Sequence, residues 1–108
     1  MKLLLPSVIV VLLCCFSKMY AQDAVRWKFQ TGAAVYSSAT VSDNSVFFGS
    51  GDMNLYSLNK TTGALQWKFT TKDAVQSTPA VSGGKVFVVS SDGNIYAVNQ
   101  STGKPAWM

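Results

Sequence analysis

The stretch "SLNKTTGALQW", residues 57–67, has a near copy forty residues later in "AVNQSTGKPAW", residues 97–107. Tryptophan stands at positions 27, 67 and 107, so one forty-residue interval separates all three. Aligning residues 27–66 with residues 67–106 needs no gap and gives 18 identical pairs out of 40. A fixed period of this length is typical of repeat proteins, in which each period forms one structural unit. We therefore expect two tandem units, residues 27–66 and residues 67–106.

The second unit contains turn signals that divide it into four short β-strands. Gly83-Gly84, Asp92-Gly93 and Thr102-Gly103 mark the turns, because glycine readily adopts the positive φ angles of tight hairpins. The predicted strands end at Ser82, span residues 85–90 and 94–99, and enter Trp107.

The first unit has less favourable turn residues, Asp43-Asn44 and Asp52-Met53, at the equivalent positions. Asparagine tolerates the left-handed conformation, so we expect it at Asn44. A positive φ angle is energetically less favourable for methionine, so we expect the Met53 turn to be of another type.

The strands "VFFGS" (46–50) and "VFVVS" (86–90) are apolar at consecutive positions. Strands of this kind are usually covered on both faces. Four antiparallel strands per forty residues, with each sheet stacked between neighbours, are typical of a β-propeller blade. A β-solenoid is the main alternative, but its repeats are generally shorter. We predict an all-β fold with about two blades of an incomplete propeller.

The repeat signatures distinguish between propeller families. The architecture is WD40-like in period, but the chain has no histidine, and its tryptophans precede Lys28, Lys68 and Met108 instead of aspartate. The quoted stretches instead resemble the tryptophan-docking motif of PQQ-like (quinoprotein-type) β-propeller repeats, Ala-x-Asp-x-x-x-Thr-Gly-x-x-x-Trp. The aspartate of that motif is Asn59 and Asn99 here, and an amide can keep the hydrogen bonds of the turn.

This resemblance implies structural roles for the repeated residues. In the family, each docking tryptophan packs between blades beside a glycine of the neighbouring unit, where the absence of a side chain allows close approach. The blade-docking residues would be Trp27, Gly63, Trp67, Gly103 and Trp107, and the turn residues Asp52, Asp92 and Gly93.

The residues after position 21 include no histidine, cysteine or glutamate. This composition removes the usual general base, thiol nucleophile and imidazole metal ligand. Asp52 and Asp92 occupy one repeat position, whereas a catalytic residue would normally occur once. We therefore expect no catalytic, cofactor-binding or metal-ligating residue, and we expect a protein that is not an enzyme.

The first 21 residues have the layout of a secretory signal peptide, with a positive start, an apolar run and Ala21 before Gln22. We predict a signal peptide over residues 1–21 and repeats over 22–108, hence a secreted or periplasmic protein with no membrane span after cleavage. A retained anchor is one alternative. Lipoprotein anchoring at Cys14 or Cys15 is another, disfavoured by Leu13, which stands where a small residue is expected.

The charge of the chain gives no indication of nucleic-acid binding. The formal charge of +4 falls once Lys2 and Lys18 are removed, leaving seven basic residues against five aspartates, 7 − 5 = +2. The basic residues are spread along the chain without a cluster, whereas a nucleic-acid site needs a basic patch.

Three functions are consistent with the sequence. The favoured one is an exported, non-catalytic repeat protein that acts as a scaffold for a protein or polysaccharide partner and needs no cofactor. The second is the N-terminal part of a PQQ-dependent alcohol or sugar dehydrogenase with PQQ and calcium, whose catalytic residues would lie elsewhere. The third is a scaffold similar to the propeller subunit of the outer-membrane β-barrel assembly machinery.

Two units are too few for a closed ring, because propellers have about four to eight blades. We therefore expect the chain to be a fragment, with the missing blades supplied by the rest of a longer chain or by self-assembly. Residues 25–30 match the last strand of a blade, residues 65–70. We expect them to complete the final blade of the ring.

Overall fold

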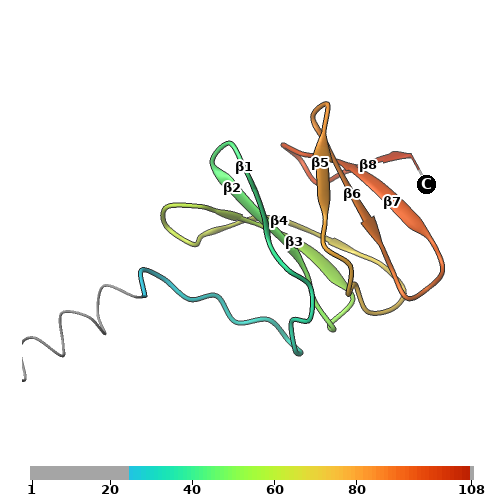
Figure 1. Cartoon of the computed structure of the whole chain (residues 1–108), viewed down its shortest axis with the longest axis horizontal. Helices are drawn as coiled ribbons and strands as arrows, with labels where there is room; N and C mark the ends of the chain where they lie inside the picture. The colour runs from blue at the N-terminus through green and yellow to red at the C-terminus, as the bar shows by residue number, and fades with distance from the viewer. Residues whose placement is uncertain (1–24, 108) are drawn as a thin grey trace, which may run out of the picture.

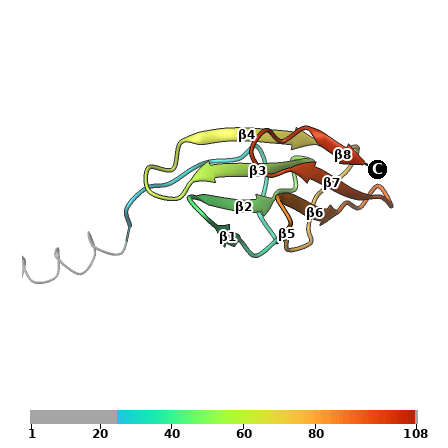
Figure 2. The ribbon, with the colours of Figure 1, turned by 90° about the horizontal axis from the view of Figure 1, so that it is seen from above.

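The computed structural model describes residues 25–107, and the predicted signal peptide lies outside the described residues. The predicted all-β fold is confirmed, with two four-stranded antiparallel sheets whose strands pair in chain order. Figure 1 shows the two sheets side by side, and Figure 2 shows them from above. The first blade contains β1 (Thr40–Ser42), β2 (Ser45–Gly49), β3 (Asn54–Asn59) and β4 (Leu65–Thr70), and the second contains β5 (Ala80–Ser82), β6 (Lys85–Val89), β7 (Ile95–Asn99) and β8 (Pro105–Trp107).

The two blades have the same register. Thr40 pairs with Phe47 in the first blade as Ala80 pairs with Phe87 in the second. The pairing shifts between Ser57 and Leu58, and again at the equivalent place between residues 97 and 98. The forty-residue period of the sequence is therefore a period of the backbone as well. Within the described residues, no helix is long and apolar enough to cross a membrane.

The predicted glycine turns are present, with φ of +58° at Gly83, +78° at Gly84 and +91° at Gly93. The two expectations for the first unit were wrong. The left-handed residue is Asp43, with φ +53°, rather than Asn44.

Met53 also adopts φ +78°, so its turn matches that of Gly93. The Met53 amide donates to the Ser50 carbonyl at 3.2 Å, as the Gly93 amide does to the Ser90 carbonyl at 3.1 Å. The hydrogen bonds of the turn therefore outweigh the steric cost of a side chain at positive φ.

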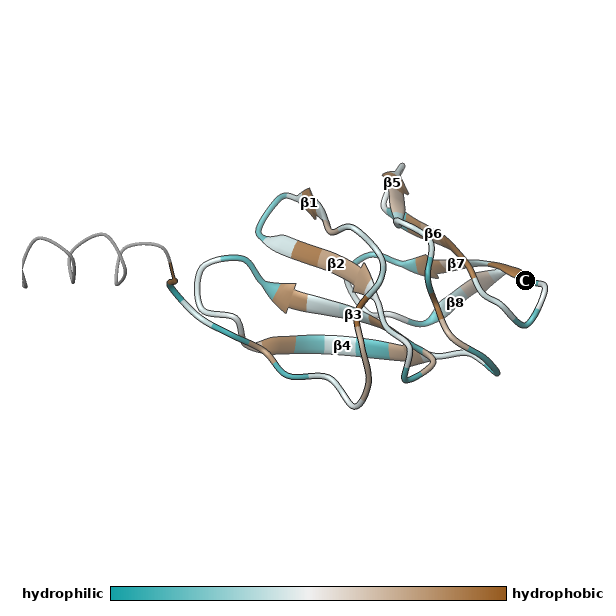
Figure 3. Cartoon of the chain, turned by 60° about the horizontal axis from the view of Figure 1, so that its bottom comes forward, coloured by the Kyte–Doolittle hydropathy of each residue, from teal (hydrophilic) through white to brown (hydrophobic). Residues whose placement is uncertain are grey.

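The core of the protein lies between the two blades. Buried side chains of the two blades pack against each other there. They are Phe47, Leu55 and Trp67 from the first blade and Val75, Val86, Val88, Tyr96 and Val98 from the second. Figure 3 shows hydrophobic residues along β2, β5 and β6. Within the described residues, each sheet has one face covered by the other blade.

The backbone of the first blade lies close to the second blade at Gly49. A Cβ at this position would lie 2.9 Å from Val75 Cβ and 2.5 Å from the Val75 carbonyl oxygen, so only glycine fits. The repeat partner of Gly49 is Val89, which is 49% exposed, and that of Val75 is Val35, which is 46% exposed. The two units therefore differ at this contact.

Residues 25–39 form no strand, although residues 25–30 resemble the sequence of β4. The segment still packs on the first blade through its side chains. Phe29 meets Tyr56 edge-on at 5.5 Å between ring centroids, as Phe69 meets Tyr96 at 5.3 Å. The role of this segment in closing a ring stays a prediction.

Candidate functional site

Four of the predicted blade-docking residues meet in two tryptophan–glycine pairs, one between the blades and one between the N-terminal segment and the first blade. Trp67 of β4 packs against Gly103 in the β7–β8 turn, and its Nε1 donates to the Gln100 carbonyl at 2.9 Å. A Cβ at Gly103 would lie 2.5 Å from Trp67 Cε3, and Gly103 has φ +74°. Two constraints, space and backbone conformation, thus require glycine here.

Trp27 makes the same contacts on the first blade. Its Nε1 donates to the Lys60 carbonyl at 3.0 Å, and a Cβ at Gly63 would lie 2.5 Å from Trp27 Cδ2. Asn59 holds this docking turn, since its Oδ1 accepts hydrogen bonds from the amides of Thr61 at 2.8 Å and Thr62 at 2.9 Å. Asparagine therefore makes the turn bonds expected of the family's aspartate.

Trp107 lies on β8 and is 50% exposed, whereas its repeat partner Trp67 is 9% exposed. Its ring lies 6.0 Å from that of Phe87, much as Trp67 lies 5.8 Å from Phe47. The side chain is thus positioned like Trp67 but has no blade over it among residues 25–107.

Asp52 and Asp92 each fasten a turn to the segment that enters the blade. Asp52 accepts hydrogen bonds from the Tyr56 hydroxyl and from the amide of Gly32 at 2.9 Å. Asp92 accepts them from the Tyr96 hydroxyl at 2.6 Å and the Lys72 amide at 3.1 Å. These aspartates are therefore occupied by structural bonds in both units.

These bonds shift the pKa values of the groups involved. Burial raises the pKa of Asp52, but the hydrogen bonds led by that from Tyr56 outweigh burial and hold it below its ordinary value. The hydrogen bond from Tyr96 is the main cause that lowers the pKa of Asp92. Burial and the bond to Asp52 raise the pKa of Tyr56, and the bond to Asp92 raises that of Tyr96. Each carboxylate is therefore stabilised in its charged form.

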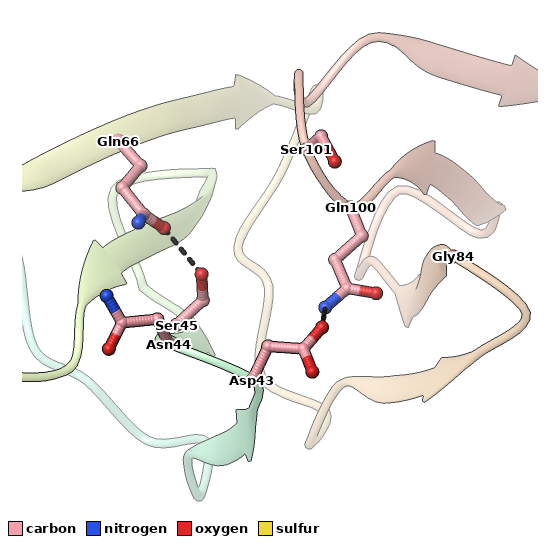
Figure 4. A pocket seen from close by; sticks show the side chains of 7 residues that line it. All are labelled: Asp43, Asn44, Ser45, Gln66, Gly84, Gln100 and Ser101. Atoms are coloured by element: carbon pink, nitrogen blue, oxygen red, sulfur yellow. Dashed lines mark hydrogen bonds between the residues drawn. The ribbon is translucent and has the colours of Figure 1, made fainter.

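A pocket of about 730 Å³ lies at the seam between the two blades, between the β1–β2 turn and the docking turn of the second blade (Figure 4). Binding sites for small ligands usually enclose about 300–1,000 Å³. Apart from Gly84, every lining residue carries a polar side chain; the residues are Asp43, Asn44, Ser45, Gln66, Gly84, Gln100 and Ser101.

Hydrogen bonds fix two glutamine side chains in this pocket. Gln66 Oε1 accepts from the hydroxyls of Ser45 and Ser57, each at 2.7 Å. Gln100 Nε2 reaches across the seam to Asp43 Oδ2 at 3.3 Å and to Ser42 Oγ at 3.3 Å. The first of these bonds and the Asp43–Gln100 bond are drawn in Figure 4. The pocket is therefore preorganised and includes side chains from both blades.

The pocket residues of the first blade do not recur in the second. Asp43, Asn44, Ser45 and Gln66 are replaced at the equivalent positions by Gly83, Gly84, Lys85 and Ala106. The docking tryptophans, glycines and turn aspartates do recur. Structural residues of a repeat are shared by its units, so a polar cluster present in one unit only is the better functional candidate.

Sequence reasoning did not identify this pocket. The available signal was the set of polar positions at which the two units differ, but the sequence gives no reason to place position 43 beside position 100. None of the predicted structural residues lines the pocket; the docking residues lie along the seams, and the turns of Asp52 and Asp92 lie at the other end of the blades.

The chemistry available in the pocket is hydrogen bonding. Asp43 is its one ionisable lining residue, and within residues 25–107 no three His, Cys, Asp or Glu side chains gather to hold a metal ion. A second pocket of about 370 Å³ at the other end of the blades is lined by Gln76, Ser77, Val89, Ser90 and Ser91. Neither lining pairs a nucleophile with a base.

Comparisons with solved structures place the fold. BamB from Moraxella catarrhalis aligns with a TM-score of 0.68 and 22% identity, over 75% of this chain and 25% of that one. A europium-containing methanol dehydrogenase aligns with a TM-score of 0.67 and 19% identity, over 76% of this chain and 18% of that one. A quinohemoprotein alcohol dehydrogenase from Pseudomonas putida HK5 aligns with a TM-score of 0.65 and 28% identity, over 75% of this chain and 14% of that one. The chain thus spans a quarter or less of the length of these relatives.

The search of curated proteins found no match to the sequence. A protein-family model described as "Outer membrane protein assembly factor BamB" matches residues 16–108. Because this match covers most of the sequence, the chain belongs to this family of PQQ-like β-propeller repeats.

Proposed function

We propose that the chain is part of an exported, non-catalytic PQQ-like β-propeller that acts as an interaction scaffold for a protein or polysaccharide. The observation that carries this proposal is the pocket at the seam, whose lining side chains are polar and whose first-blade residues do not recur in the second unit. The repeated aspartates and tryptophans are engaged in structural bonds. Fold by itself does not confer an activity, so the proposal rests on the site.

The non-catalytic part of the proposal is tested with the purified full-length protein. PQQ and calcium are added together, binding is followed by isothermal titration calorimetry, and dye reduction is measured with a series of alcohols and sugars. We expect neither binding nor turnover. Turnover that depends on PQQ would overturn the proposal.

Export is tested separately. The layout of residues 1–21 and the outer-membrane role in the description of the family both support a location outside the cytoplasm. We expect a mature chain that begins near Gln22, detected by mass spectrometry of the fractionated host. An uncleaved chain confined to the cytoplasm would contradict export.

A PQQ-dependent dehydrogenase is the second candidate, supported by 28% identity to the quinohemoprotein alcohol dehydrogenase. Calcium prefers six to eight oxygen ligands, with carboxylates prominent among them. Residues 25–107 gather no such set, so they do not fit the metal of that cofactor. Any cofactor ligands would have to come from outside these residues.

A scaffold in outer-membrane protein assembly is a specific form of the proposed function, supported by the family description. It predicts that the tagged protein co-purifies with components of that assembly machinery from detergent-solubilised membranes. Co-purification that persists in high salt and is absent with an unrelated exported propeller would support this form. Its absence would leave a scaffold for other partners.

A further inference from the structure

We propose that the seam pocket binds a neutral glycan, recognised through its hydroxyl groups. This inference rests on the proposed scaffold function and names the partner class for its site. The pocket lies at the end of the blades that carries the β1–β2 and docking turns, whereas the turns of Asp52 and Asp92 lie at the opposite end. It is therefore separate from the repeated aspartate–tyrosine bonds.

The pocket presents hydrogen-bonding groups that the fold does not use. Among the described residues, the Asn44 side-chain amide and the Ser101 hydroxyl make no hydrogen bond. Gln66 uses its Oε1 for two serine hydroxyls, so both N–H groups of its amide remain for a ligand. Gln100 uses its Nε2, so its Oε1 remains as an acceptor. Both donors and acceptors thus line one pocket.

The charge of the lining indicates which ligands fit. Asp43 is the one charged residue, and no lysine or arginine lines the pocket. A phosphate, sulfate or acidic sugar would meet the Asp43 carboxylate without a compensating cation, so anionic ligands are disfavoured. A neutral ligand is favoured.

The polarity of the lining distinguishes a glycan from a peptide. No aromatic or aliphatic side chain lines the pocket, whereas protein interfaces bind mainly through aromatic and arginine anchors in desolvated pockets. A sugar hydroxyl both donates and accepts hydrogen bonds, as serine hydroxyls do. Different hydroxyls of one glycan can therefore pair with donors such as the Gln66 N–H groups and with acceptors such as the Gln100 Oε1.

The lining residues are also oriented before any ligand arrives. The Gln66 amide is held by Ser45 and Ser57, and Ser57 is fully buried. Gln100 is held by Ser42 and Asp43 on the other blade. Preorganisation lowers the entropic cost of binding, which matters for a site whose lining side chains recognise a ligand by hydrogen bonds.

The test uses the full-length protein and three neutral probes, maltohexaose, cellohexaose and chitohexaose, each titrated by saturation-transfer difference NMR. The pocket variant combines Asn44→Ala with Ser101→Ala, because neither side chain bonds to the described part of the fold. The matched control combines Gln76→Ala with Ser91→Ala, which also removes one amide and one hydroxyl but from the second pocket. Thermal melting of both variants verifies folding.

We expect at least one hexasaccharide to bind, the pocket variant to bind it about tenfold more weakly, and the control to bind unchanged. Binding of none of the three, or equal weakening by both variants, would overturn the inference. A peptide or protein that the pocket variant loses, and that the hexasaccharides do not displace, would assign the pocket to a protein partner and also overturn it. PQQ-dependent turnover is a different result, since it would overturn the scaffold function itself.

Discussion

Trp67 and Gly103, thirty-six residues apart, join the two blades. The indole occupies the space that a side chain at position 103 would need, and its Nε1 donates a hydrogen bond to the Gln100 carbonyl at 2.9 Å. The same relationship holds between Trp27 and Gly63. The contact between the two blades and the contact between the N-terminal segment and the first blade therefore each depend on one ring and on one missing side chain.

Replacing Gly103 by alanine tests this close approach. The new Cβ would both meet the Trp67 ring and sit at φ +74°. Positive φ costs about 1–2 kcal/mol for a residue with a Cβ, and overpacking adds about 1–3 kcal/mol. We expect unfolding in urea to show a loss of about 3 kcal/mol. Gly93→Ala is the control, because Gly93 has φ +91° and no atom within 4 Å of its Cβ position. An equal loss of stability in both variants would show that the contact with the Trp67 ring does not contribute to the effect.

Truncating the ring itself is the complementary change. Trp67 is 9% exposed, and replacing a buried large aromatic residue by alanine typically costs 3–5 kcal/mol. We expect Trp67→Ala to lose roughly this free energy of unfolding in the intact propeller. Tyr36, which is 70% exposed, gives the control Tyr36→Ala, for which we expect little change. A Trp67→Ala loss near zero would contradict a docking role.

The aspartate–tyrosine bonds predict a dependence of stability on pH. The pKa values of Asp52 and Asp92 are lowered in the folded protein, so their stabilisation is present above about pH 4 and is lost as pH falls through the folded values. The pKa values of Tyr56 and Tyr96 are raised, so their stabilisation is present below about pH 10 and is lost as pH rises through the folded values. We expect Tm to fall at both extremes.

Removing the two tyrosine hydroxyls should reduce this dependence. In the double variant Tyr56→Phe with Tyr96→Phe, we expect a Tm that is lower near neutral pH and changes less toward acid and alkali. Tyr36→Phe serves as the control, because Tyr36 is exposed. A pH profile of the double variant that matches the wild type would assign the dependence to other groups.

Met53 offers a stabilising change. It adopts φ +78°, while its repeat partner is Gly93. Glycine would remove a left-handed cost of about 1–2 kcal/mol but lose about 0.5–1 kcal/mol through the entropy of the unfolded chain. We expect Met53→Gly to gain about 0.5–1 kcal/mol in a urea titration. Gly93→Met should have the opposite sign, and a gain from both changes would contradict the shared turn geometry.

The repeat allowed most of the fold to be predicted from the sequence. Period, turn glycines and apolar runs are local or regular signals, and each corresponds to a feature of the backbone. Asp43 and Met53 were misjudged because intrinsic preference was weighed without the surrounding hydrogen bonds. The strand register pairs Ser42 with Ser45, and the Ser50–Met53 bond closes the next turn.

The conformation of the N-terminal segment and the location of the pocket could not be predicted from local sequence signals. Residues 25–30 have the sequence of an outer strand, but strands need a hydrogen-bonded neighbour, and among the described residues none pairs with them. The pocket depends on Asp43 and Gln100, which meet only because two blades stack. Long-range contact of this kind cannot be predicted from the pattern of either unit alone.

Gly49 and Val89 make the two units unequal as neighbours. Glycine at 49 leaves space for the backbone and side chain of Val75, whereas the second unit has a half-exposed Val89 at the equivalent position. A unit with valine at the facing position, as the first unit has at Val35, would meet the Val89 side chain if it followed the second unit in the same register. We therefore expect a copy of residues 27–66 placed after residues 67–106 to stack better once Val89 is replaced by glycine. Units that look alike in sequence thus differ in the neighbour that each accommodates.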